Sequence, residues 1–491
     1  MAKHISMKKH VITAIILAGC LTFASAGAFA AAVDWPTFGK DRERTGNNPS
    51  ETVLNATNVN LGLHQHWVTR LNGAILTQPT LAAGVKVNGV STDVVYAATM
   101  AGTMYALNAA TGAIIWQQSV PPATTPRCPG LFQGVIGFMG TPTIERSTNR
   151  LYIVSGRGYL HAYDLATGAD TPGFNLPIID AANFWPRTFV YGSPNLIGSS
   201  LYIATAGDPC DDQPYHGQVV QVRTTAPPAV VGRWYPNGPN GPDGGGIWGA
   251  GGVSIPPDGS VEYALTGNAF ANPENFGFSE HVVKLSPALA VAASNSPVSP
   301  APSGPDIDFG ATALLFQAAG TPVTMLAAYN KNGNLYIYSR ATIQQHGPIA
   351  TFTIAQPSAD GSNIGLPAFD PILNQLYVVS PSDSPNGIFK HGVIALAVAP
   401  SGAISLKWQT QVGNNTPVFN PAISPIVANG VVYHAAVSNT VYALRATDGV
   451  VLWSTSITPV RSGEGNFASP MVVNGQLFVA GSDHALHAYG L

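Results

Sequence analysis

The chain has 491 residues, of which only 10% are charged, and its formal net charge is −3 at pH 7. Soluble domains usually carry roughly 25% charged residues, so glycine, serine, threonine and asparagine must supply much of the polar surface. No basic run suits nucleic acid, and after residue 30 no apolar run is long enough to span a bilayer. The length would allow two or three domains, but nothing resembling a linker interrupts residues 60–491.

Residues 1–30 have the composition of a signal peptide. Three lysines precede an apolar run from Val11 to Phe23, and residues 28–30 (Ala-Phe-Ala) offer a small-x-small cleavage site. A second interpretation stays open, because residues 17–20 (Leu-Ala-Gly-Cys) resemble a bacterial lipobox that would make Cys20 a lipid anchor. Both interpretations predict export, to the periplasm or outside the cell, with cleavage near Ala30 in the first.

After a lead-in segment (residues 31–60), a repeated pattern fills the chain. Val94–Trp116, Arg150–Gly168 and Val431–Trp453 each contain an alternating strand, a polar turn, a second strand with tyrosine and a Thr-Gly or Asp-Gly turn. Alternation interrupted by such turns predicts antiparallel hairpins. A further strand that begins with a small residue and proline precedes each unit. Four strands repeated about every 45 to 55 residues are typical of propeller blades. Eight blades are predicted, beginning near Thr77, Gly140, Gly192, Gly249, Ala311, Gly365, Ile423 and Ala468.

The two ends of the repeat array predict how the ring closes. The last blade ends at Leu491 without an outer strand, whereas Leu61–Leu71 is an orphan strand with Trp67 where an outer strand carries tryptophan. We therefore predict an all-β, eight-bladed propeller of four-stranded antiparallel blades over residues 61–491, in which the N-terminal strand completes the C-terminal blade. The repeat tryptophans are predicted to pack between blades: Trp67, Trp116, Trp234, Trp408 and Trp453.

Strand order also predicts which face of the ring carries the binding site. Loops between the second and third strands lie on the same face as the crossings between blades, which we call the crossing face. Three of these loops are long: Ala206–Gly217, Gly267–Glu280 and Pro381–Gly392. Enlarged loops on one rim of a rigid scaffold are where binding usually occurs.

The two cysteines after the signal sequence fall on this face. Cys128 lies in the crossing into the second blade, and Cys210 lies in the long insertion of the third. Because export places them in an oxidising compartment, we predict a disulfide between them.

The repeat motif resembles a known family. Tyr105–Trp116 and Tyr442–Trp453 both follow the pattern Tyr-Ala-Leu-x-Ala-x-Thr/Asp-Gly-x-x-x-Trp, which resembles the pyrroloquinoline-quinone (PQQ) repeat. Asp34–Pro49 resembles the lead-in of the same proteins. This repeat builds the propellers of quinoprotein alcohol dehydrogenases and of outer-membrane assembly lipoproteins, so one fold carries two classes of function.

The resemblance to the dehydrogenases implies a set of site residues. Gly-Gly-Gly-x-Trp, which contains Gly246 and Trp248, would supply the ring on which PQQ stacks, although the bland interpretation of this stretch is a turn leading to a core tryptophan. Thr-Gly-Asn, ending at Asn268, would supply a calcium-ligating amide, with Asp208 of the third-blade insertion as a further metal ligand. An aspartate of the crossing, Asp306 or Asp308, would be the catalytic base. Lys331 would meet the quinone oxygens.

Departures from the family pattern keep an alternative open. The chain has no adjacent pair of cysteines, no glutamate in the third-blade insertion and no C-x-x-C-H haem motif. The alternative is a non-catalytic propeller that binds a protein or another cell-envelope partner. The dehydrogenase interpretation predicts a small-molecule substrate, an alcohol or a sugar.

Overall fold

The computed structural model describes residues 1, 32–125, 134–179, 187–298, 306–358, 362–418, 420–460 and 468–491. Cys20, Cys128 and the predicted signal sequence beyond Met1 lie outside the described residues. Residues 32–491 form one compact unit. The described helices are α1 (Ala56–Val59) and α2 (Ile343–His346). Among the described helices, none is long and apolar enough to cross a membrane.

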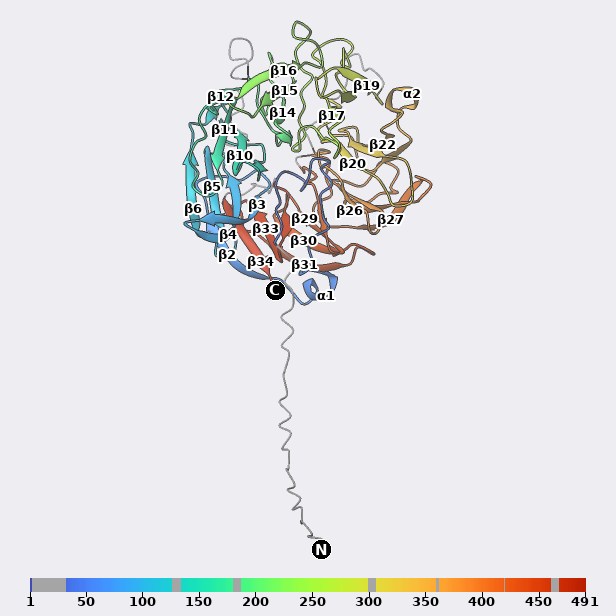
Figure 1. The fold of residues 1–491 in the computed structure, drawn as a ribbon. Helices are drawn as coiled ribbons and strands as arrows, with labels where there is room; N and C mark the ends of the chain where they lie inside the picture. Colours follow the sequence, from blue (N-terminus) through green and yellow to red (C-terminus); the bar gives the residue numbers. More distant parts are fainter. Residues whose placement is uncertain are drawn as a thin grey trace. The chain divides into compact units, whose positions relative to one another are not determined.

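Eight antiparallel sheets form a ring of blades (Figure 1), as predicted. The first blade consists of β3 (Thr80–Val87), β4 (Val90–Ala98), β5 (Thr103–Asn108) and β6 (Ile114–Ser119), and the second of β9 (Thr143–Glu145), β10 (Arg150–Val154), β11 (Tyr159–Asp164) and β12 (Leu176–Pro177). The third blade consists of β13 (Asn195–Ile197), β14 (Ser200–Thr205), β15 (Gln218–Arg223) and β16 (Ala229–Trp234), and the fourth of β17 (Glu262–Leu265), β18 (Val282–Leu285) and β19 (Val291–Asn295). In the fourth blade, an isolated bridge between Ser254 and Tyr263 takes the place of a first strand.

The other four blades each have four strands in one sheet, and the seventh gains β1 (Asn47–Asn48). The fifth blade consists of β20 (Leu314–Phe316), β21 (Met325–Tyr329), β22 (Asn334–Ser339) and β23 (Ala350–Thr353), and the sixth of β24 (Ala368–Asp370), β25 (Gln375–Ser380), β26 (Gly392–Val398) and β27 (Ile404–Thr410). The seventh blade consists of β28 (Ile426–Ala428), β29 (Val431–Ala435), β30 (Thr440–Arg445) and β31 (Val451–Ser456), and the eighth of β32 (Met471–Val473), β33 (Gln476–Ala480), β34 (Ala485–Gly490) and β2 (His64–Arg70). A short hairpin, β7 (Ala123–Thr124) with β8 (Val135–Ile136), lies in the crossing after the first blade.

The N-terminal strand closes the ring, which confirms the prediction. Strand β2 pairs antiparallel with β34, from His64 opposite Gly490 to Arg70 opposite Ala485. The outer edge of the last blade is therefore covered by the beginning of the chain.

The core consists of layers between neighbouring blades. Alternate residues of a strand face opposite sides of the sheet, and β4 shows the consequence. Val94 and Tyr96 pack into the layer shared with the second blade, whereas Val95 and Ala97 pack into the layer shared with the last blade. Both faces of each blade are thus buried, which explains strands that are nearly all apolar.

The repeat tryptophans join these layers to the turns of the next blade. Trp116 donates a hydrogen bond of 3.0 Å from its Nε1 to the carbonyl of Leu165. A methyl group placed on Gly168 would lie 2.6 Å from the Trp116 ring, so the tryptophan covers the glycine turn of the next blade. Trp67 covers Gly112 in the same way. The predicted inter-blade role is confirmed at these positions.

The lead-in segment has a role that sequence analysis did not predict. Residues 34–48, which we call the central segment, run inside the ring and bond to the inner side of every blade (Figure 1). Backbone bonds of 2.7–3.0 Å join it to Leu81, Ile144, Ile255, Leu315, Phe369 and Val427. Arg44 Nη2 reaches the carbonyl of Ser193 in the third blade at 3.2 Å, and Asn48 reaches Val472 in the eighth at 2.9 Å.

Candidate functional site

The glycine run before Trp248 lies between two loops and is joined to them by isolated bridges from Gly244 to His216 and Ala269. The N–H of Gly245 donates to the carbonyl of Asn268 (2.7 Å), and the N–H of Gly217 donates to the carbonyl of Gly244 (2.9 Å). A methyl group on Gly217 would lie only 1.8 Å from the Gly245 carbonyl oxygen. The glycines therefore let the insertions of the third and fourth blades approach the crossing closely. The glycine run thus brings the main chain close to the chain's own loops.

Trp248 follows this glycine run, and its side chain is half-buried. Its ring centroid is 5.3 Å from that of Tyr191 and 6.1 Å from that of Tyr215, in tilted and edge-on geometry. Its buried Nε1 has no hydrogen-bond partner among the described residues. The indole is thus held from the side by two tyrosines, without being fully enclosed, which is compatible with a stacking platform.

Lys331 binds the two aspartates of the crossing into the fifth blade. Its Nζ lies 2.7 Å from Asp306 Oδ2 and 3.0 Å from Asp308 Oδ2. Burial alone would lower the pKa of Lys331, but Asp308 and Asp306 outweigh it and raise the pKa above its ordinary value. The Lys331 backbone N–H also donates to the Asp308 carbonyl (3.0 Å), which fixes the turn against the crossing.

Gly267 is the point where the candidate residues meet. Asp308 Oδ1 accepts a hydrogen bond from the backbone N–H of Asn268. A methyl group on Gly267 would lie 2.5 Å from Asp308 Oδ1 and 2.8 Å from Trp248 Nε1. The structure therefore brings Trp248, Asn268, Asp308 and Lys331 together, with Asp306 joined through Lys331.

Glu280, which sequence reasoning missed, lies beside this group. It ends the insertion that Asn268 begins, and its N–H donates to the Gly267 carbonyl (2.9 Å). Glu280 is fully buried, and neither of its carboxylate oxygens has a hydrogen-bond partner among the described residues. Its place at the end of a long insertion was the available signal. We call Trp248, Asn268, Glu280, Asp306, Asp308 and Lys331 the crossing-face cluster.

The carboxylates of the cluster repel one another. Burial, followed by the charge of Asp308, raises the pKa of Asp306 to about 7, although Lys331 opposes the shift. The same two causes raise the pKa of Asp211 to about 7 and that of Glu280 to about 8. Because the crossing-face cluster contains three carboxylates and one cation, Lys331, it holds more acid than base and favours a proton or a cation.

Other predicted residues lie apart from the cluster or have other partners. Asp208 accepts the N–H groups of Cys210 and Asp212, each at 3.0 Å, as a turn residue does. Cys210 is disulfide-bonded, but Cys128 lies outside the described residues, so their pairing stays a prediction. Within the described ranges, no three His, Cys, Asp or Glu side chains are arranged to hold a metal ion.

The donor chemistry of the cluster nevertheless fits calcium and a planar quinone in part. The buried Oδ1 of Asn268 and Oδ1 of Asp306 have no hydrogen-bond partner in the described part of the chain. Calcium takes oxygen ligands of this kind. Trp248 offers an aromatic ring, and Lys331 offers a cation, although both aspartates already bind it.

The comparisons with known proteins agree with this architecture. The family profile described as "Glucose/ethanol/alcohol dehydrogenase, beta-propeller domain" matches residues 35–177. The profile described as "Outer membrane protein assembly factor BamB" matches residues 390–490. A comparison with curated protein sequences found no match.

Among solved structures, the chain is similar to a quinohemoprotein alcohol dehydrogenase from Comamonas testosteroni, with 16% identity and a TM-score of 0.66 over 94% of this chain and 81% of that one. A europium-containing methanol dehydrogenase shows 15% identity and a TM-score of 0.68 over 93% of this chain and 98% of that one. BamB from Moraxella catarrhalis shows 13% identity and a TM-score of 0.55 over 87% of this chain and all of that one, 100%.

At these identities, structural likeness establishes the fold alone. The ring of blades, the repeat motif and the two profile matches define a β-propeller built from PQQ repeats. These findings match a PQQ-repeat propeller family, as the sequence predicts.

Proposed function

We propose that this protein is an oxidoreductase that oxidises an alcohol or a sugar with PQQ and calcium bound at the crossing-face cluster. The observation that carries the proposal is the convergence at Gly267, where Trp248 and Asp308 meet although 60 residues separate them in the sequence. A scaffold has no evident need for a half-buried tryptophan, an unpartnered amide and a Lys–Asp network on one rim. If bound there, PQQ would supply the hydride acceptor and calcium would supply Lewis-acid polarisation of the quinone.

Each residue of the cluster receives a role from its surroundings. Trp248, reached through Gly246, supports the cofactor ring. The unpartnered oxygens of Asn268 and Glu280 are the calcium ligands that we assign. Asp208 ranks behind them, because its Oδ1 already accepts two N–H groups.

The two aspartates differ in burial and in hydrogen bonding, and we use these differences to assign one as the catalytic base and the other as a positioning residue. Asp308 is fully buried, and its two oxygens are engaged by Asn268 and Lys331. The Asp306 side chain is 31% exposed, and its Oδ1 has no partner among the described residues. With its pKa raised to about 7 by burial and Asp308, Asp306 suits a general base at neutral pH. We assign Asp306 as the base that takes the hydroxyl proton and Asp308 as the residue that positions Lys331 and Asn268.

Titration with PQQ, with and without calcium, tests the proposal. Quenching of tryptophan fluorescence should saturate in the parent only when calcium is present. Trp248→Ala and Lys331→Ala should weaken PQQ binding at least tenfold, whereas Lys390→Ala, a matched surface lysine, should not. Asp306→Asn should retain PQQ but lose turnover by about 10²- to 10⁴-fold. Equal PQQ affinity in Trp248→Ala, Lys331→Ala and the parent would refute the site.

A binding scaffold is the second candidate, because residues 390–490 match the BamB profile. It would have a protein or cell-envelope partner in place of PQQ and substrate. A parent protein that fails to bind PQQ at any calcium concentration would favour this function.

We further propose that the protein is periplasmic or secreted. Intact-mass measurement of protein recovered outside the cytoplasm should find an N-terminus near Ala30. A chain that begins at a lipid-modified Cys20 would favour the lipoprotein alternative instead. The proposed Cys128–Cys210 disulfide closes a loop of about 80 residues and stabilises the fold by roughly 4 kcal/mol in the chain-entropy treatment. Two free thiols in the unreduced protein would exclude it.

A further inference from the structure

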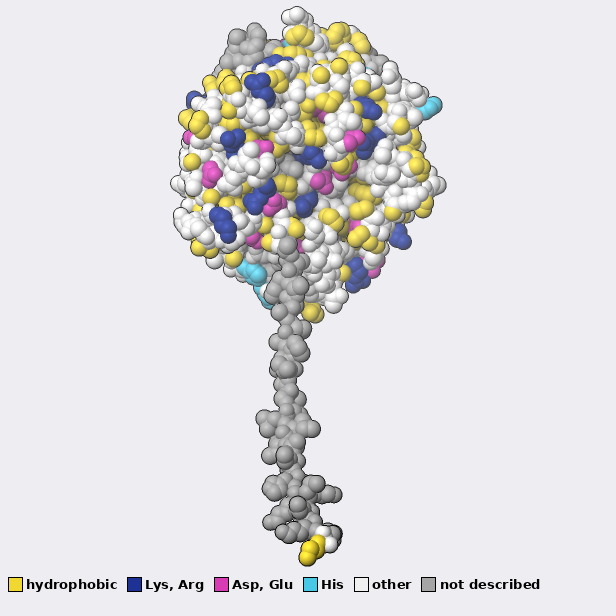
Figure 2. Space-filling model, viewed as in Figure 1, with side chains coloured by type: hydrophobic (Ala, Val, Ile, Leu, Met, Phe, Trp, Pro, Cys, Tyr) yellow, Lys and Arg dark blue, Asp and Glu magenta, His cyan; other side chains and the backbone are white. Residues whose placement is uncertain are grey.

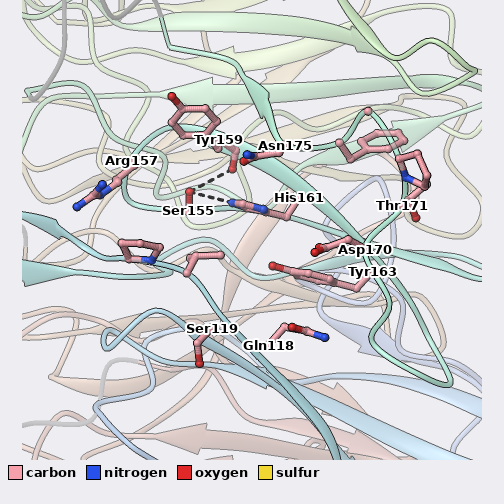
Figure 3. A pocket seen from close by; sticks show the side chains of 15 residues that line it. Gln118, Ser119, Ser155, Arg157, Tyr159, His161, Tyr163, Asp170, Thr171 and Asn175 are labelled. Atoms are coloured by element: carbon pink, nitrogen blue, oxygen red, sulfur yellow. Dashed lines mark hydrogen bonds between the residues drawn. The ribbon is translucent and has the colours of Figure 1, made fainter.

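A cavity outside the crossing-face cluster lies between the first and second blades (Figure 3). The second blade has an outer strand, β12, of only two residues, whereas the outer strands of the first and third blades, β6 and β16, have six each. Strand β12 pairs with Tyr159 and Leu160, and residues 169–171 bond to Ala162 and Asp164 further along β11. Residues 172–175, which connect these two contacts, line the cavity. The space of about 540 Å³ that remains is the size of a small-molecule site.

The wall of this cavity combines aromatic surface with free planar polar groups. Tyr159 is exposed, whereas Tyr163 and Phe174 are buried behind it. The polar groups come from both blades: Gln118, Arg157, Asp170 and Asn175. The side chains of Gln118, Asp170 and Asn175 form no hydrogen bond with any other described residue. Arg157 donates only its Nε, to the Pro122 carbonyl (3.1 Å), which leaves the terminal nitrogens for a ligand.

His161 adds an acceptor to this wall. Ser155 Oγ donates to the Tyr159 carbonyl (3.3 Å), so it accepts a hydrogen bond from His161 Nε2 (3.2 Å), as drawn in Figure 3. Nδ1 is then the acceptor nitrogen of the ring. The His161 ring is stacked on Tyr163 with an interplanar angle of 2°, so its orientation is fixed.

The charges on the wall balance. Arg157 is the one cation and Asp170 the one carboxylate among the lining residues, so the cavity has no net charge to attract an ion. On the face drawn in Figure 2, basic and acidic side chains of the described residues are likewise interspersed. Planar amide, carboxylate and guanidinium groups each present two polar atoms to neighbouring hydroxyls, and an exposed aromatic ring suits the C–H face of a sugar ring.

We propose that this cavity is a binding site for a neutral saccharide. The site is separate from the crossing-face cluster and does not depend on PQQ or calcium. Tyr159 supplies the aromatic face, and Gln118, Asp170 and Asn175 bind the hydroxyl groups.

The test is calorimetric titration of the protein, free of PQQ and calcium, with maltose, cellobiose and N,N′-diacetylchitobiose. At least one should bind, and digalacturonate, an acidic disaccharide, should bind at least tenfold more weakly. Tyr159→Ala should weaken binding more than tenfold, and Gln118→Ala should weaken it about three- to tenfold, the effect of one hydrogen bond.

Gln117→Ala is the matched control, because Gln117 is the preceding residue of β6, is exposed and does not line the cavity. It should leave affinity unchanged. Failure of all three neutral disaccharides to bind would overturn the proposal. So would a preference for digalacturonate, or a Gln117→Ala effect as large as that of Gln118→Ala. Because the cofactors are absent, failure of the proposed oxidoreductase activity cannot produce these outcomes.

Discussion

Trp408 Nε1 donates a hydrogen bond of 2.9 Å to the carbonyl oxygen of Ala446, across the boundary between the sixth and seventh blades. The same ring lies over Gly449, where a methyl group would meet Trp408 Cε3 at 2.4 Å. The turn glycine and the strand tryptophan, the two most regular positions of the repeat, therefore contact each other between blades rather than within one. This contact explains why the repeat needs both.

Gly449→Ala should destabilise the protein far more than Gly430→Ala. Both glycines lie in the seventh blade with φ of +75° and +77°, but a methyl group on Gly430 would have nothing within 4 Å. The shared left-handed backbone costs about 1 kcal/mol in each variant, and overpacking against Trp408 adds about 1–3 kcal/mol to the first alone. Urea unfolding midpoints measure the difference. Equal midpoints would show that Trp408 can move away from the added methyl group at no cost in stability.

Lys331→Met should destabilise the fold by about 2–4 kcal/mol at pH 8, because it leaves Asp306 and Asp308 without their cation. Lys390→Met is the control, since the Lys390–Asp383 pair is more than 30% exposed on both sides and should contribute less than about 1 kcal/mol. Protons can replace the lost cation at low pH, so the gap between the two variants should narrow at pH 5. A gap that stays constant with pH would contradict the proposed charge balance.

His161→Gln should flatten the pH dependence of stability between about pH 6.5 and 4. Burial lowers the pKa of His161 to about 4, with Asp170 as the opposing neighbour. In this range the His161 side chain binds a proton in the unfolded chain but not in the folded protein. This histidine therefore lowers the free energy of unfolding as the pH falls, by up to about 1.4 kcal/mol per pH unit.

Glu43, whose pKa burial raises to about 7, acts in the opposite direction, but it does so equally in both proteins. The measurement is therefore the difference between the two urea curves at each pH. The difference in free energy of unfolding between the two proteins should stay constant above pH 7. A difference that also stayed constant down to pH 4 would exclude the effect of His161.

Arg44→Met should cost about 3 kcal/mol or more, because Arg44 is fully buried in the central segment and its bonds hold carbonyls that would lose their donor. Its Nη1 donates to Thr37 Oγ1 at 2.7 Å and to the Phe38 carbonyl at 3.0 Å. Arg42→Met, in the same segment, removes only an exposed bond of 3.3 Å to Pro257 and should change stability by less than about 1 kcal/mol. Thermal melting of the two variants separates the cases.

The blades and the closing strand could be predicted because their signals are local. The alternation in β4, the turn glycine and Trp67 each predict a contact with the adjacent strand or blade, whose position follows from the repeat. For Glu280 the sequence offered only its place at the end of a long insertion, because its burial beside Asp308 depends on the crossing into the next blade. The central segment was equally hidden, because its partners follow no periodic pattern in residues 34–48.

The two aspartates of the crossing show a different limit. The resemblance assigned Asp306, Asp308 and Lys331 to one implied site, and in the structure Lys331 binds both aspartates. The sequence could not separate them, because the difference lies in burial and in the bond from Asn268 to Asp308. Such differences depend on packing, which a motif does not contain.

The central segment also determines how this protein must fold. Open repeat arrays gain stability one neighbour at a time, so they can form from any point along the chain. Here Asn48 bonds to a carbonyl 424 residues away, and β2 pairs with β34, which lies at the other end of the repeat array. Contacts of such long sequence separation slow folding. The central segment and β2 therefore make the eight blades depend on one another, so that we expect the ring to fold as one cooperative unit rather than blade by blade.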